Sequence, residues 1–356
     1  MDIPSPLAVE RDDRYDWLMV GCAAWLLVGL FADGWSHYHD VRESFFTPYH
    51  AVLYAGFFSN VLAVGVPLLA NLRRGLRWPN ALAPGYDLTA IGVAIFTIGV
   101  VPDFTWHRVF GIEEGIDVLI SPTHLFMGIG MALILLGPAR AAFARPSPPT
   151  RLEDQAPMLV SLGLFLAMIE FTLQFAFDPG VSSSNAPLAP GASGTTTNLA
   201  FFLLPFTYYK EALGITIVII HTALLAGFAL FAVRNAKLAP GALTLLFTLP
   251  ALLMAVLLSA GALSVYVPVV VALAGGAFAD VLVARLQPGP ARPREFRLFA
   301  IAVPAFVQAL YLGLSALLLG GVWWDVNFTF GSVLFAGVVG VLLSYLMLSP
   351  AHLRET

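Results

Sequence analysis

The chain has 356 residues, of which 58% are hydrophobic and 11% charged, and its formal net charge is −4 at pH 7. A soluble protein of this length cannot bury so much apolar surface, so the composition predicts a polytopic membrane protein, for which we expect no nucleic-acid partner. The single cysteine, Cys22, excludes an internal disulfide, a thiolate zinc site and iron–sulfur ligation, so any metal site must use nitrogen and oxygen ligands.

Ten apolar segments approach the length of about 20 residues that a membrane-spanning helix needs. In chain order they are 17–33, 49–71, 87–104, 120–142, 156–178, 211–233, 241–261, 263–284, 297–320 and 328–349. A bilayer admits only helices or closed barrels, and these segments are too long and too uniformly apolar for barrel strands. The sequence therefore predicts an all-α polytopic membrane protein with about ten transmembrane helices.

Basic residues gather at alternate ends of these segments. One set of ends carries Arg11, Arg14, Arg73, Arg74, Arg77, Arg140, Arg145, Arg151, Arg234, Lys237, Arg285, Arg292, Arg294, Arg297 and Arg354. The other set carries Arg42, Arg108 and Lys210. The positive-inside rule then predicts a multi-pass protein of the cell (inner) membrane with both termini in the cytoplasm.

Two polar stretches, 70 residues apart, repeat one pattern. Residues 33–50 read DGWSHYHDVRESFFTPYH, and residues 103–124 read DFTWHRVFGIEEGIDVLISPTH. Each opens with Asp-x3-His, closes with Thr/Ser-Pro-x-His, and joins the end of one apolar segment to the start of the next. We therefore expect a parallel repeat of helices 1–2 and 3–4, with both stretches facing the periplasm or its equivalent.

The spacing within the first stretch brings three side chains together. Asp33 and His37 are four residues apart and so share one face at the end of a helix. Thr47 and Pro48 are typical of a helix start, which places His50 in the first turn of the next helix. One carboxylate and two imidazoles then converge on one point.

The second stretch repeats this arrangement with Asp103, His107 and His124, after the helix-start pair Ser121-Pro122. A carboxylate with two imidazoles suits a borderline divalent ion, for which the affinity order favours copper, with zinc as the alternative. Non-haem iron uses a similar set, and the residue types alone do not choose among these metals.

These residues resemble the C subunit of the copper membrane monooxygenases, a family that includes particulate methane monooxygenase and ammonia monooxygenase. The family's first metal set, Asp-x3-His-x12-His with an internal Arg and a Phe-Thr-Pro-x-His ending, is matched by Asp33, His37, Arg42, Phe46-Thr47-Pro48 and His50. Its second set, with a Glu-Glu pair and a Pro-x-His ending, is matched by Asp103, His107, Glu113-Glu114, Pro122 and His124, where Asp103 stands in place of the family's Asn.

The resemblance covers roughly residues 15–145 and implies a division of the chain. Residues 1–150 are expected to form a four-helix metal-site half similar to the C subunit, and residues 151–356 to add transmembrane helices of unknown role.

The resemblance also implies a function. Each Asp/His/His set would hold one copper, and Asp103, His107 and His124 would be the catalytic set that oxidises a small apolar substrate with O2. Electrons would come from quinol or another donor, and the partners would be other monooxygenase-like subunits in a multi-subunit complex, or further copies of this chain. Arg42, Glu113 and Glu114 would orient the ligands or steer cations and protons, unless they are ordinary solvated loop charges.

Two other functions fit the same sequence. One is non-catalytic binding or transport of copper or zinc, and the other is transport of an organic solute without any metal. A transport path for metal needs ligands deeper in the bundle, where Glu170 and His221 are the candidates, because an ionisable group inside a span is costly.

Overall fold

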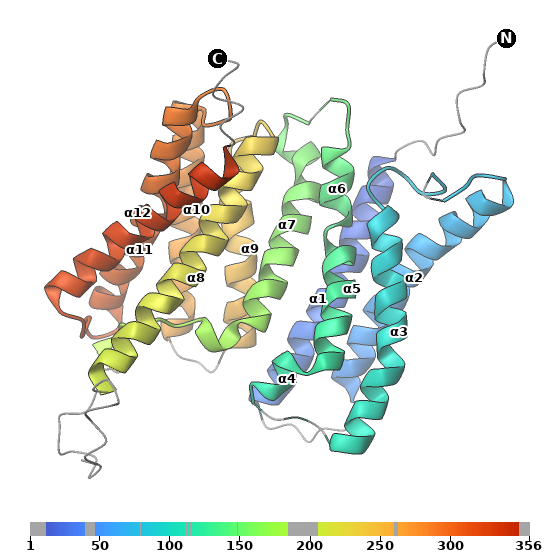
Figure 1. Cartoon of the computed structure of the whole chain (residues 1–356), viewed down its shortest axis with the longest axis horizontal. Helices are drawn as coiled ribbons and strands as arrows, with labels where there is room; N and C mark the ends of the chain where they lie inside the picture. Colours follow the sequence, from blue (N-terminus) through green and yellow to red (C-terminus); the bar gives the residue numbers. More distant parts are fainter. Residues whose placement is uncertain are drawn as a thin grey trace. The chain divides into compact units, whose positions relative to one another are not determined.

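The structure is a computed structural model that describes residues 12–39, 47–78, 80–111, 113, 115–147, 149–183, 206–259 and 263–348. Its helices are α1 (Asp13–Tyr38), α2 (Pro48–Arg73), α3 (Asp87–Phe110), α4 (Asp117–Ile120), α5 (Pro122–Leu135), α6 (Gly137–Phe143), α7 (Leu152–Thr172), α8 (Phe206–Asn235), α9 (Ala242–Leu257), α10 (Val267–Leu286), α11 (Pro293–Leu318) and α12 (Val326–Met347) (Figure 1). Two short 3-10 helices, η1 (Gln174–Ala176) and η4 (Leu263–Tyr266), lie between them.

Within the described residues, nine helices are long and apolar enough to cross a membrane, with α5 and α6 together forming one of them. The predicted all-α polytopic membrane fold is therefore confirmed. The predicted seventh segment, 241–261, is the shorter helix α9, which has 16 residues. The predicted fifth segment, 156–178, begins and ends earlier, as α7, because the apolar run continues beyond the helix into η1 and gives no signal of where the helix stops.

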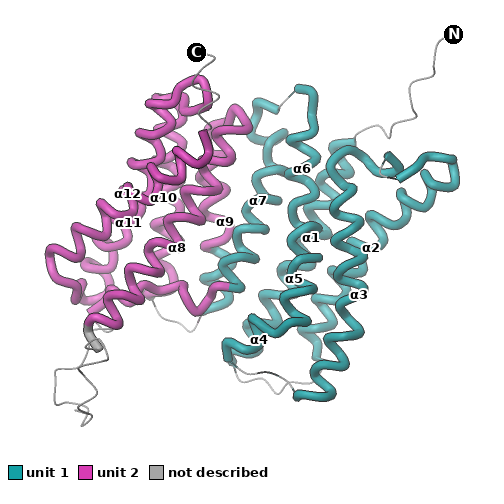
Figure 2. The backbone as a smooth tube through the Cα atoms, viewed as in Figure 1, with its two compact units in different colours: residues 1–172, 252–258 teal, residues 173–251, 259–356 magenta. Residues whose placement is uncertain are grey.

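The chain divides into two compact units (Figure 2). Unit 1 comprises Met1–Thr172 with Leu252–Leu258, and unit 2 comprises Leu173–Ala251 with Ser259–Thr356. Both Asp/His/His stretches belong to unit 1. The functional division that we expect at residue 150 remains a prediction, because compactness alone does not assign roles to the later helices.

In unit 1, α1 and α2 approach each other at two glycines. A Cβ atom added to Gly29 would lie 2.4 Å from the Cα atom of Leu53, and one added to Gly56 would lie 2.6 Å from the backbone nitrogen of Leu26. Because neither glycine has a side chain, the two backbones come close together, as is common for helices that pack in membranes. This contact brings the end of α1 beside the start of α2.

The same contacts recur between α3 and α5. A Cβ atom added to Gly99 would lie 2.5 Å from the Cγ atom of Met127, and one added to Gly130 would lie 2.8 Å from the backbone nitrogen of Phe96. Gly99 precedes Asp103 by four residues, and Gly29 in α1 precedes Asp33 by the same number. The predicted repeat of helices 1–2 in helices 3–4 is thus present in the packing of the two helix pairs.

A buried polar network ties the other ends of these helices together. Asp16 in α1 accepts a hydrogen bond from the Tyr86 hydroxyl at 2.7 Å through Oδ1, and one from Arg145 at 3.3 Å through Oδ2. Tyr86 directly precedes α3, and Arg145 follows α6. The network therefore fixes α1 against α3 and α6. These contacts help to set the position of the α1–α2 pair relative to the α3–α5 pair.

Unit 2 contains α8, α10, α11 and α12, with the segment after η1 bound to the connection between α11 and α12. Ser183 N donates to Gly321 O at 2.9 Å, and Trp323 N donates to Val181 O at 3.2 Å. His221 lies in α8, and its Nε2 atom is 2.7 Å from the carbonyl oxygen of Ala176. This hydrogen bond gives His221 a structural role in unit 2.

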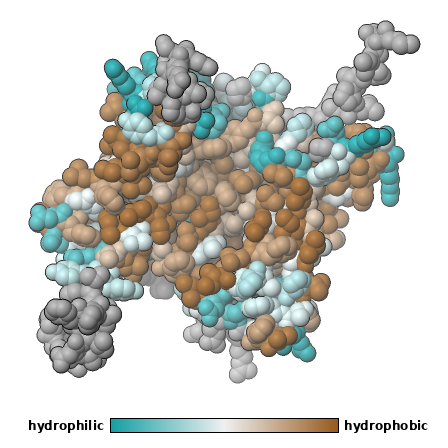
Figure 3. Space-filling model, viewed as in Figure 1, coloured by the Kyte–Doolittle hydropathy of each residue, from teal (hydrophilic) through white to brown (hydrophobic). Residues whose placement is uncertain are grey.

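On the face shown in Figure 3, the surface is mainly apolar around the helix midsections, and hydrophilic residues gather toward the helix ends. Val101 in α3 is 69% exposed and Leu346 in α12 is 82% exposed. Side chains of this kind are stable at a surface that faces lipid, which agrees with the length and apolarity of the helices.

The glycine contacts generate a prediction for stability. Gly29→Ala places a methyl group against the backbone of Leu53 and should destabilise the protein by about 1–3 kcal/mol, the usual cost of overpacking. Gly21→Ala in the same helix is the matched control, because a Cβ atom there meets nothing within 4 Å. Thermal unfolding in detergent should show a lower midpoint for the first variant alone. Equal midpoints would mean that the close approach of α1 and α2 does not stabilise the fold.

Candidate metal centre

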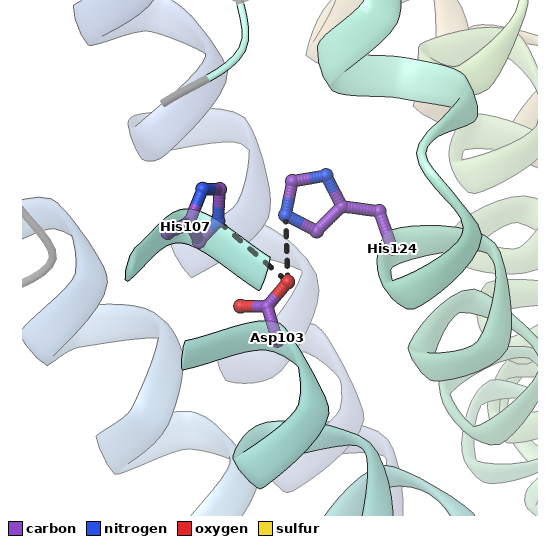
Figure 4. Close-up of side chains that lie close together, drawn as sticks. All are labelled: Asp103, His107 and His124. Atoms are coloured by element: carbon purple, nitrogen blue, oxygen red, sulfur yellow. Dashed lines mark ion pairs between the residues drawn. The ribbon is translucent and has the colours of Figure 1, made fainter. Parts of the chain in front are cut away.

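The second cluster consists of Asp103 in α3, His107 one turn later, and His124 in the first turn of α5 (Figure 4). The Nε2 atom of His124 lies 3.2 Å from Asp103 Oδ1, and that of His107 lies 3.6 Å from the same oxygen. The ligand atoms of the three residues are all within 4.8 Å of one another. The Asp103 side chain is only 3% exposed, so the carboxylate is removed from bulk water.

The ring of His124 is fixed by a backbone contact on its far side. Its Nδ1 atom lies 2.6 Å from the carbonyl oxygen of Val118, the second residue of α4. A carbonyl oxygen only accepts hydrogen bonds, so Nδ1 carries the proton and Nε2 presents a lone pair toward Asp103. The short helix α4 therefore selects the tautomer that a metal ligand requires.

The ring of His107 likewise presents Nε2 to Asp103 and Nδ1 to oxygen acceptors. Its Nδ1 atom lies 3.1 Å from Oε2 of Glu113 and 3.4 Å from the carbonyl oxygen of Gly111, and both of these oxygens are acceptors. Nδ1 is therefore the protonated nitrogen, and Nε2 faces Asp103. A carboxylate behind a ligating histidine is the common arrangement that orients the ring and increases the basicity of the other nitrogen. Glu113 thus lies beside His107.

The carboxylate of Asp103 is also oriented. The hydroxyl of Thr123 donates to Asp103 Oδ1 at 2.9 Å. Thr123 follows Pro122, and Ser121 is the N-cap of α5, so the predicted helix start is correct. The Ser121 hydroxyl itself makes no capping hydrogen bond. Buried atoms with no well-formed hydrogen bond in the described part of the chain include Ser121 Oγ and both carboxylate oxygens of Glu113.

The first cluster has the same members in a more open arrangement. The Nε2 atom of His37 lies 3.7 Å from Asp33 Oδ2, and that of His50 lies 3.5 Å from Asp33 Oδ1. Thr47 caps α2 by accepting from His50 N at 3.1 Å, and its hydroxyl also lies 3.2 Å from His50 Nδ1. The two imidazoles approach different oxygens of one carboxylate, and the Asp33 side chain is 14% exposed.

The donor set of the second cluster fits a metal ion. Bonds of about 2.0–2.2 Å at tetrahedral angles place neighbouring nitrogen and oxygen ligands about 3.3–3.5 Å apart. The 3.2 and 3.6 Å separations around Asp103 Oδ1 bracket this spacing. Two imidazoles and a carboxylate that face one another at this distance are balanced by a proton on an imidazole or by a cation, and a divalent ion with nitrogen and oxygen ligands satisfies all three. The structure therefore supports a metal-binding group, and its chemistry leaves the identity of the metal open.

Several predicted site residues lie elsewhere. Arg42 and Glu114 are outside the described residues. His39, another histidine of the first stretch, stacks on Trp35 with ring centroids 3.9 Å apart and contacts the Trp35 carbonyl oxygen through Nδ1. Glu170 lies in α7 and belongs to neither cluster.

Sequence reasoning missed three parts of the centre: the Thr123 hydroxyl, the Val118 carbonyl oxygen, and the glycine four residues before each aspartate. Only the glycine left a signal, because Gly29 and Gly99 extend the repeated pattern to Gly-x3-Asp-x3-His in both stretches. A backbone carbonyl has no side-chain signature, and a threonine within a helix start is expected there for other reasons.

Comparisons of this chain with protein-family models, with curated proteins and with solved structures found no match.

The hydroxyl of Thr123 provides a test of the centre. Thr123→Val keeps the side-chain shape but removes the donor that orients Asp103, so metal affinity should fall by about tenfold, the low end of the effect of such supporting residues. Thr97→Val in α3 is the control, because that hydroxyl bonds only to the Val93 carbonyl oxygen of its own helix. Competition with a chelator of known affinity measures the change. Unchanged affinity in the first variant would show that the hydrogen bond to Asp103 has no role in metal binding.

Proposed function

We propose that this chain is a membrane-integral copper-binding protein, similar in function to the C subunit of the copper membrane monooxygenases, with zinc as the alternative metal. The observation that carries the proposal is the convergence of His107 Nε2 and His124 Nε2 on one buried oxygen of Asp103. In this proposal the Asp103 cluster is the catalytic centre, and the Asp33 cluster is a second, more open copper site.

The resemblance supports the choice of copper and of oxidation chemistry. It rests on the order of the two metal sets and on the Pro-x-His ending of each, and the structure places both endings at helix starts. When bound, copper would supply the redox chemistry by which O2 oxidises a small substrate.

The residues of the chain would contribute orientation and exclusion of water. Thr123 would hold the carboxylate, while the carbonyl oxygens of Val118 and Gly111 would hold the imidazole rings with their Nε2 atoms toward Asp103. The carboxylate of Glu113 could also accept or supply a proton at the edge of the centre, because it lies against His107 without competing hydrogen bonds from the described residues.

The surroundings of the second cluster suit an apolar substrate that arrives from the bilayer. Phe104 and Leu125, the neighbours in sequence of Asp103 and His124, are 40% and 47% exposed. Ile116 and Ile120, which flank the contact between α4 and His124, are 48% and 50% exposed. Apolar side chains thus surround the polar centre on the outer surface of the helices.

The proposal includes the side of the membrane and the partners. By the positive-inside rule both clusters would face the periplasm or its equivalent, in the cell (inner) membrane. Quinol or another donor would supply electrons, and further monooxygenase-like subunits, or other copies of this chain, would complete the enzyme.

Substitution of one ligand tests this function. His124→Ala should remove one copper per chain and abolish donor-dependent O2 consumption, because a carboxylate and one imidazole are too few ligands to hold the ion. His39→Ala is the control, since that ring stacks on Trp35 and should leave copper content and turnover unchanged. Elemental analysis and oxygen uptake by purified protein with a quinol donor provide the measurements.

Two results would contradict the proposal in different ways. Turnover by a His124→Ala protein that has lost this copper would rule out the Asp103 cluster as the catalytic centre. Copper binding without O2 consumption, in wild-type protein supplied with donor and substrate candidates, would favour the non-catalytic role in copper or zinc handling.

A further inference from the structure

Glu113 lies behind one of the two imidazoles of the second cluster. It follows α3, and its Oε2 atom is 3.1 Å from His107 Nδ1. The other ring nitrogen of His107, Nε2, is 3.6 Å from Asp103 Oδ1. One imidazole ring therefore lies between two carboxylates, and the width of that ring separates Glu113 from the atoms that would bind an ion.

The contact between Glu113 and His107 is electrostatic. Nδ1 of His107 hydrogen-bonds to the Gly111 carbonyl oxygen at 3.4 Å, and the two buried carboxylate oxygens of Glu113 have no well-formed hydrogen bond in the described part of the chain. A buried carboxylate without hydrogen-bond donors is costly and calls for an explanation. A cation bound beside His107 would provide one, because opposite charge stabilises the carboxylate through space.

The charges of the centre match those of a divalent ion. The described carboxylates that contact its two rings belong to Asp103 and Glu113, whose side chains are 3% and 13% exposed. With neutral imidazoles, a divalent ion balances both charges, whereas a monovalent ion leaves one of them unbalanced away from water. Asp103 is a ligand for either ion, so Glu113 supplies the charge that distinguishes the two.

We infer that Glu113 makes the Asp103 cluster selective for divalent over monovalent ions, because it places a second negative charge behind the His107 ligand. The inference rests on the proposed function, since it needs the cluster to bind an ion. It assigns Glu113 no bond to the metal. For copper, this selectivity means that Cu²⁺ is held more tightly relative to Cu⁺, which lowers the reduction potential of the bound ion.

The charge of the ion determines the size of the effect. Coulomb attraction is proportional to the product of the two charges, so Glu113 attracts a divalent ion twice as strongly as a monovalent ion at the same place. Removing the carboxylate should therefore cost twice as much, on a logarithmic scale of affinity, for Cu²⁺ as for Cu⁺. A residue that only orients the His107 ring affects both ions alike, so unequal losses are the signature of a charge effect.

Competition with chelators of known affinity tests the inference in full-length protein. The background His37→Ala with His50→Ala confines binding to the Asp103 cluster. In this background Glu113→Gln, which removes the charge but keeps the side-chain shape, should weaken binding of Cu²⁺ by about a hundredfold and of Cu⁺ by about tenfold, the range found for residues that support metal ligands. Glu153→Gln is the control, because Glu153 is 63% exposed on α7 and should leave both affinities unchanged.

Each other outcome has a definite meaning. Equal losses for the two ions in Glu113→Gln, or no loss for either, overturn the selectivity and leave the metal centre intact. A background protein that binds neither Cu²⁺ nor Cu⁺ overturns the proposed function as well.

The reduction potential provides a second measurement, by potentiometric titration of the copper-loaded background protein monitored by electron paramagnetic resonance. Glu113→Gln should raise the midpoint potential of the Cu²⁺/Cu⁺ couple by about 59 mV, which is the tenfold change in the affinity ratio expressed as a potential. Glu113→Asp keeps the charge and should shift the potential less. Equal shifts in the two variants, or an unshifted potential in Glu113→Gln, would overturn the inference.

Discussion

The oxygen of Asp103 that faces His107 and His124 imposes the central constraint on this protein. Both imidazoles have Nδ1 hydrogen-bonded to a backbone carbonyl oxygen, so in the neutral rings the Nε2 lone pairs point at a carboxylate that is almost fully buried. Neutral imidazoles and a carboxylate repel one another unless a proton or a metal cation lies between them, and the cost is highest away from water. The fold supplies the helix packing that holds them together, and a bound metal ion would supply the missing charge.

The two clusters are related by repetition, but they are not equivalent. Both arise because glycines let one helix of a pair approach the next closely, which places a first-turn histidine opposite an aspartate. Among the described residues, the second stretch has α4 and Glu113 behind its histidines, and the first has the Thr47 hydroxyl against His50. Additional support of this type restricts ring rotation, which lowers the entropy that is lost when an ion binds. Because the Asp103 side chain is also less exposed than that of Asp33, we expect the Asp103 cluster to be the tighter of the two sites.

Much of this arrangement was predictable from sequence because it depends on local spacing. Asp-x3-His on a helix and a Pro-x-His helix start determine where the ligands point, and apolar length determines which segments cross the bilayer. Features that depend on tertiary contacts were not predictable. The hydrogen bonds from Thr123 and to Val118 join different elements, and α7 ends within an apolar run.

Pulsed electron paramagnetic resonance of the copper-loaded protein tests the central claim most directly. In a variant without the first cluster, His37→Ala with His50→Ala, the account predicts one Cu²⁺ per chain, with electron spin echo modulation from the remote Nδ1 nitrogens of two imidazoles. His124→Ala in this background should remove the signal. Copper that shows no imidazole modulation, or a protein that binds no copper, would contradict the assignment of Asp103, His107 and His124 as a metal centre.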